Sequence, residues 1–115
     1  MATVPSSSSS SPTLQELTEI QRSMCAQRSW QVHHTPRNLT LATAAEIGEL
    51  SRILQWKGDI GDRPMEGAED KQCVAAELSD VLLNVIRLAD VCGIDVSRVT
   101  SEKLEDLAHR VPPKS

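Results

Sequence analysis

The sequence lacks the aromatic residues that most small domains bury. Among its 115 residues there is no phenylalanine and no tyrosine, and tryptophan occurs twice. The core must therefore be built from Leu, Val, Ile, Ala and Met, a composition that favours helices packed on helices over a sheet sandwich. A chain of this length forms one small domain with a small core, so helical oligomerisation is an expected way to bury more apolar surface.

Other absences narrow the range of functions. The net charge is −4 at pH 7 and no basic stripe is present, so neither a nucleic acid polymer nor a membrane is expected as a partner. No apolar run is long enough to span a bilayer, and we expect no secretory signal at the N-terminus. The cysteines, Cys25, Cys73 and Cys92, form no C-x-x-C pair, which indicates reduced thiols in a cytoplasmic compartment.

Two pairs of carboxylates are the main chemical signal. Glu46-Ile-Gly-Glu49 and Glu77-Leu-Ser-Asp80 each place two acids three residues apart within an apolar helical pattern, so each pair shares one helix face. Four crowded carboxylates repel one another, and a hard divalent cation such as Mg²⁺ is the usual remedy where phosphates also bind. A single pair would more often be a solvated helix face, but two pairs favour a metal site.

Helix signals divide the rest of the chain. Thr13 and Glu16 fit a capping box, Thr35 precedes Pro36 as an N-cap, and Asp95 can cap a last helix. The serine run before Pro12 cannot bury apolar area and is expected to be disordered. The sequence therefore predicts a tail over residues 1–12, a domain over 13–111 with helices over about 13–28, 36–57, 71–92 and 95–110, and a tail over 112–115.

Helix lengths also predict how the acidic pairs meet. If the second and third helices are antiparallel, the two pairs lie at similar depth, with Glu49 opposite Glu77 and Glu46 opposite Asp80. Gly48, in the middle of the second helix, suggests a close approach by another backbone or a ligand.

A dense cluster of binding-type side chains lies between the first two helices. It runs from Trp30 through His34 to Asn38 and is expected to form a loop. Two interpretations remain open: Trp30 and the histidines bind a ligand, or Trp30 covers the core while the histidines are solvated.

In combination these residues resemble the MazG-like all-α nucleoside triphosphate pyrophosphatases. The resemblance covers about residues 14–95 and implies a four-helix bundle that assembles as a dimer or tetramer. The motifs that carry it are Trp30 with His34, Pro36-Arg37-Asn38-Leu39, Glu46-Ile-Gly-Glu49-Leu50, Gln55-Trp56-Lys57 and Glu77-Leu-Ser-Asp80-Val81.

The resemblance also implies an activity and a set of roles. The substrate would be dCTP or a related dNTP, cleaved by water to the monophosphate and pyrophosphate. Glu49, with Glu46, would orient the attacking water. The Mg²⁺ ligands would be Glu46, Glu49, Glu77 and Asp80, and the substrate-binding residues Trp30, His34, Arg37, Asn38, Trp56, Lys57, Asn84 and Lys103.

The sequence departs from the family pattern in three places. Asn84 stands where the family usually has an aromatic residue, and Arg52 replaces an acid after the first pair. On the last helix Leu107 replaces an asparagine, and the ending is Arg110-Val111-Pro112. These changes leave a second interpretation open, a catalytically degenerate helical module that binds nucleotide or pairs with an active subunit. A di-iron bundle is excluded, because neither Glu49 nor Glu77 is followed three residues later by histidine.

Overall fold

The computed structural model of the chain describes residues 10–55, 67–111 and 113, and all regular secondary structure within these ranges is helical. The predicted all-α class is thereby confirmed. The predicted N-terminal tail, Trp56, Lys57 and the following connection fall largely or wholly outside the described residues. The elements are α1 (Leu14–Gln27), the 3₁₀ turn η1 (Trp30–His33), α2 (Pro36–Leu54), α3 (Ala68–Val91) and α4 (Val96–Arg110).

The predicted helix starts are present with their side-chain caps. Thr13 and Glu16 form the reciprocal capping box of α1. The Thr35 hydroxyl accepts from the backbone N–H of Asn38, and the Asp95 carboxylate caps α4 in the same way. Each cap satisfies a backbone donor that the first helical turn leaves unpaired, which is why these short local patterns were predictive.

Two boundaries differ from the expectation. The segment after α1 forms the single 3₁₀ turn η1, where a loop was predicted. Helix α3 begins at Ala68, three residues before the predicted start at Lys71. Glu69 and Asp70 lie in its first turn, where negative charge stabilises the helix N-terminus.

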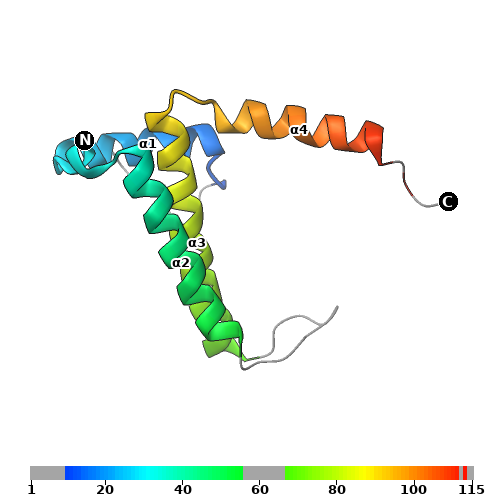
Figure 1. Cartoon of the computed structure of the whole chain (residues 1–115), viewed down its shortest axis with the longest axis horizontal. Helices are drawn as coiled ribbons and strands as arrows, with labels where there is room; N and C mark the ends of the chain where they lie inside the picture. Colours follow the sequence, from blue (N-terminus) through cyan, green and yellow to red (C-terminus); the bar gives the residue numbers. More distant parts are fainter. Residues whose placement is uncertain (1–9, 56–66, 112, 114–115) are drawn as a thin grey trace.

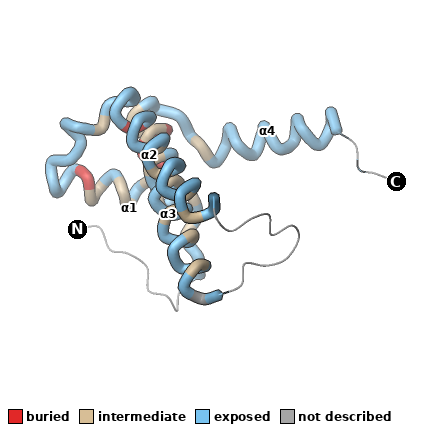
Figure 2. The backbone as a smooth tube through the Cα atoms, turned by 60° about the horizontal axis from the view of Figure 1, so that its bottom comes forward, coloured by how far each residue is buried: buried red, intermediate tan, exposed pale blue. Residues whose placement is uncertain are grey.

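Helices α2 and α3 run antiparallel side by side, and α1 crosses them at the end where α3 finishes (Figure 1). The described core is small and lies at this crossing (Figure 2). Its most deeply buried large side chain is Ile86, with 1% of its surface exposed, and its other buried apolar residues are Cys25, Leu39 and Ala89. The core therefore fixes the three helices that carry the residues of interest below.

Helix α4 projects away from the other helices, so a single chain does not close the expected four-helix bundle (Figure 1). None of its residues is buried, and Leu104 is 64% exposed. The cap at Asp95 predicted this helix correctly, but the described residues of one chain leave its apolar side uncovered. Within the described ranges, no helix has the length and apolar character needed to cross a membrane.

Candidate functional site

Three of the four predicted metal ligands come together between α2 and α3. Ligand atoms of Glu46, Glu77 and Asp80 all lie within 4.8 Å of one another, and we call these residues the three-carboxylate cluster. Glu46 comes from the middle of α2 and the other two from α3, so the antiparallel pairing places Glu46 beside Asp80 as predicted. The other predicted pair, Glu49 with Glu77, is not formed, because Glu77 meets Glu46 instead. Sequence-distant acids are thus concentrated at one point, which is costly without a positive charge.

Glu77 has both a raised pKa and a buried carboxylate oxygen without a partner among the described residues. Its pKa is raised above the ordinary value, first by a hydrogen bond with the Glu46 carboxyl and then by desolvation and the neighbouring acids. Its Oε2 is buried and has no hydrogen-bond partner among the described residues. An all-oxygen donor set with an orphaned carboxylate oxygen fits a hard divalent cation, so the residues present fit the magnesium that the sequence implied.

Glu49 does not join the cluster. Its side chain is exposed, and Oε1 lies 3.7 Å from Nη1 of Arg52, one turn further along α2. Its charge still contributes to the raised pKa of Glu77. The residue that departs from the family pattern, Arg52, is therefore the partner of the predicted fourth ligand.

The cluster opens onto a pocket of about 530 Å³ between α1, α2 and α3, which we call the central pocket. Glu46 and Asp80 line it together with three predicted substrate-binding residues, Trp30, His34 and Asn84. A volume in this range suits a small organic ligand. The pocket therefore joins carboxylates to an aromatic ring and to hydrogen-bonding side chains in one space.

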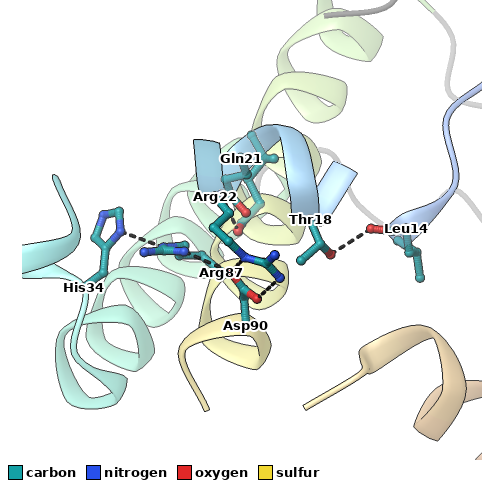
Figure 3. Close-up of polar contacts among 8 residues, drawn as sticks. Leu14, Thr18, Gln21, Arg22, His34, Arg87 and Asp90 are labelled. Carbon is teal, nitrogen blue, oxygen red and sulfur yellow. Dashed lines mark hydrogen bonds and ion pairs between the residues drawn. The ribbon is translucent and has the colours of Figure 1, made fainter. Parts of the chain in front are cut away.

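A polar network of four side chains ties the wall of the pocket together (Figure 3). Arg87 Nε donates to His34 Nδ1 over 2.9 Å, and Arg87 Nη1 donates to Asp90 Oδ2 over 3.1 Å. Arg22, on α1, donates to both Asp90 oxygens, at 2.6 Å and 3.0 Å. The network thus links α1, α3 and His34, the residue that follows η1.

The network shifts the ionisation of two of its members. The pKa of His34 is lowered by desolvation first and then by the charges of Arg87 and His33, which favours the neutral imidazole. The pKa of Asp90 is lowered chiefly by its hydrogen bond from Arg22, although burial opposes this shift. Both groups are therefore held in one charge state near neutral pH.

Trp30 lines the central pocket and is half exposed. Its relative exposure is 48%, and the Arg28 guanidinium lies 5.4 Å from its ring centroid, a cation–π distance. Between them Ser29 has a left-handed backbone with φ of 56°, which turns the chain from α1 into η1. Trp30 is thus oriented by local structure while one side of it remains free, and it does not serve as a fully buried cover of the core.

Other predicted substrate-binding residues lie outside the pocket. Arg37 is exposed, and the Asn38 side chain donates to the backbone carbonyl of His33 over 3.0 Å, which holds η1 against α2. Lys103 is exposed on the projecting α4. Trp56 and Lys57 lie outside the described residues.

Sequence reasoning missed three polar residues of this region. Arg87 is buried, with 6% of its surface exposed, and lines the pocket with its partner Asp90 behind it. Gln21 donates to the Leu83 carbonyl, but its Oε1 is buried without a partner among the described residues. A positive residue inside the apolar stripe of α3 was the available signal for Arg87.

Known proteins that resemble this chain are nucleotide pyrophosphatases by name. The sequence signature described as the MazG nucleotide pyrophosphohydrolase domain matches residues 34–114. The dCTP pyrophosphatase 1 of Rattus norvegicus is 36% identical over 109 residues, which cover 94% of this chain and 64% of that protein. The Homo sapiens dCTP pyrophosphatase 1 is 35% identical over 103 residues, covering 88% of this chain and 60% of that protein. This chain thus matches less than two thirds of the length of these curated relatives.

A solved structure shows the same fold. The crystal structure of a pyrophosphatase from Archaeoglobus fulgidus superimposes with a TM-score of 0.68 and 26% identity, covering 91% of this chain and 97% of that one. The resemblance noted in the sequence is confirmed by the domain match across most of the chain. The chain belongs to the MazG nucleotide pyrophosphohydrolase domain family.

Proposed function

We propose that the chain is a Mg²⁺-dependent pyrophosphatase that hydrolyses dCTP or a related dNTP to the monophosphate and pyrophosphate. The observation that carries the proposal is that the central pocket is lined both by Glu46 and Asp80 of the three-carboxylate cluster and by the predicted base-binding residues Trp30 and His34. The names of the relatives support the substrate class. The nucleotide substrate and the free cysteines fit a cytoplasmic location, which we also propose.

In this proposal the carboxylates bind the cation, and the other pocket residues bind the base. Glu46, Glu77 and Asp80 would hold the cation, which when bound neutralises phosphate charge and activates water. Trp30 offers a ring face for stacking on the base, and His34 and Asn84 offer hydrogen bonds to it. The surrounding apolar residues of α1 limit the access of bulk water to one side of the base.

Glu49 lies outside the three-carboxylate cluster, in an exposed ion pair with Arg52. A surface pair such as Glu49–Arg52 contributes only about 0–1 kcal/mol, so little free energy opposes rotation of Glu49 toward the cluster. We propose that Glu49 becomes the fourth carboxylate ligand and, with Glu46, orients the attacking water.

We also propose that the active form is a homodimer or homotetramer. Leu78, Leu82 and Val85 form an exposed apolar row at helical spacing on α3, and α4 exposes further apolar side chains. A second copy of the chain would cover these surfaces. Sedimentation velocity tests this: a monomer at micromolar concentration would contradict it, and charged substitutions at Leu82 and Leu104 should dissociate the assembly.

The decisive experiment is pyrophosphate release from a panel of dNTPs and NTPs, with and without Mg²⁺. We expect release that requires the cation and favours dCTP. Glu46→Gln and Asp80→Asn should each abolish it, because each removes a cluster ligand. Glu69→Gln, which removes an exposed acid from the first turn of the same helix as Asp80, is the matched control and should retain activity.

The competing candidate is a degenerate module that binds nucleotide or pairs with an active subunit. It is favoured by the sequence changes at Leu107 and Val111 and by the position of Lys103 on α4, a helix that contributes no residue to the lining of the central pocket. Folded, assembled protein that binds dCTP but releases no pyrophosphate from any nucleotide would support this candidate and refute the enzyme.

A further inference from the structure

The contact between Arg87 and His34 determines where the imidazole proton lies. Arg87 Nε carries a hydrogen and can only donate, so the His34 Nδ1 that it meets at 2.9 Å must be an unprotonated acceptor. A neutral ring with a bare Nδ1 carries its proton on Nε2. The geometry alone therefore defines the tautomer.

Arg87 is itself held firmly in place. Its side chain is 7% exposed, and its Nη1 donates to Asp90, which Arg22 holds from α1 (Figure 3). The guanidinium is a planar group with fixed donor directions, so anchoring one nitrogen orients the others. The direction of the Nε–H bond toward His34 is thus set by residues on two helices.

The other side of the imidazole is available. His34 lines the central pocket, and its Nε2 makes no hydrogen bond within the part of the chain that the structure describes. A pocket nitrogen that carries a proton is a donor, and it suits an acceptor on a ligand.

We propose that Arg87 is a positioning residue that fixes His34 as the Nε2–H tautomer, so that the central pocket presents a hydrogen-bond donor to a ring nitrogen or carbonyl oxygen of the nucleotide base. The ligand part of this inference rests on the proposed function, whereas the positioning part concerns the protein without nucleotide. Arg87 does not touch the substrate in this scheme and acts only through His34.

Two other roles for Arg87 make different predictions. A purely structural arginine would affect stability and leave the His34 proton unchanged. An arginine that binds the ligand directly would affect binding independently of His34.

The first experiment is long-range ¹H–¹⁵N correlation NMR of histidine-labelled protein without nucleotide, at a pH where His34 is neutral. The His34 signals are assigned by their loss in His34→Ala. In the unsubstituted protein we expect only the Nε2–H tautomer, and in Arg87→Met a mixture of both tautomers. Arg98→Met removes an exposed arginine of a similar ion pair on α4 and should leave the spectrum unchanged.

The second experiment is calorimetric titration with dCMP, which carries the base but has no phosphoanhydride bond for a pyrophosphatase to cleave. Arg87→Met and His34→Ala should each weaken binding about tenfold, the effect of losing one hydrogen bond. The double variant should be no weaker than His34→Ala, because Arg87 acts through His34.

Each result decides the proposal. A proton on Nδ1 of His34 in the unsubstituted protein would overturn it without any variant, as would an unchanged tautomer in folded Arg87→Met. Losses that multiply to about a hundredfold in the double variant would assign Arg87 to direct binding instead. Absence of dCMP binding would overturn the ligand part, whereas dCMP binding without pyrophosphate release would refute only the proposed catalysis.

Discussion

The two ends of the Arg22–Asp90 ion pair should differ sharply in their importance for stability. The Arg22 side chain is 55% exposed and that of Asp90 only 13%. Asp90 also neutralises Arg87, whereas Arg22 has Asp90 as its hydrogen-bonded partner. Asp90→Asn and Arg22→Met break the same ion pair. The first leaves Arg87 without its charged partner, whereas the second leaves Asp90 still paired with Arg87.

The structure allows the magnitudes to be worked out. Asp90→Asn leaves the buried Arg87 charge without a counter-charge, and losing one partner of a buried pair costs about 3–5 kcal/mol. Arg22→Met leaves Asp90 still paired with Arg87 and removes a largely exposed cation, so we expect about 1 kcal/mol or less. A typical small domain has only about 5–15 kcal/mol of total stability, so the first loss would be severe.

Urea unfolding followed by circular dichroism measures both variants at fixed protein concentration. The pKa of Asp90 lies below its ordinary value of 3.8, so its contribution is complete above that pH and is lost as the pH falls through the lower folded-state pKa. The difference between the unsubstituted protein and Asp90→Asn should therefore shrink in acid. Equal losses in the two variants at pH 7 would refute the reasoning, because they would mean that burial of Arg87 plays no part.

Three further outcomes are expected. Mg²⁺ should raise the melting temperature at pH 7, as measured by calorimetry. Glu77→Gln should remove that increase because it removes a cluster ligand. The same increase in both proteins would contradict the metal site. Arg52→Gln should tighten Mg²⁺ binding by freeing Glu49, as measured by titration, and weaker binding would show that Glu49 is not recruited. Gly48→Ala should raise the free energy of unfolding by about 0.5–1 kcal/mol, because a Cβ there meets nothing within 4 Å in the single chain; a loss of stability would instead indicate the close approach that the sequence suggested.

Local rules predicted most of the fold. Caps at Thr13, Thr35 and Asp95 depend on residues within four positions, and each was found where the sequence placed it. The proximity of Glu46 to Asp80 followed from helix length once the two helices were assumed to be antiparallel, whereas the same reasoning paired Glu49 with Glu77, which the structure does not show.

The remainder depended on three-dimensional packing that no local pattern contains. Arg87 follows a buried isoleucine, and only the crossing of α1 reveals that the arginine is buried with Asp90 as its partner. Glu49 shares a helix face with Glu46, but in the structure its side chain lies beside Arg52 instead, in an exposed pair too weak to be predicted from the sequence. The sequence likewise did not predict that α4 projects away from the other helices, because an amphipathic pattern indicates an apolar side without identifying what covers it.

The projecting α4 makes the assembly state visible in backbone dynamics. A helix of 15 residues that packs on little else is marginal in water, since most helical stability comes from tertiary contacts. In dilute solution its amide hydrogens should exchange with deuterium far sooner than those around Ile86 in α3. Exchange in α4 should slow as protein concentration rises, so the exchange rate of this one helix measures the fraction of chains that have assembled.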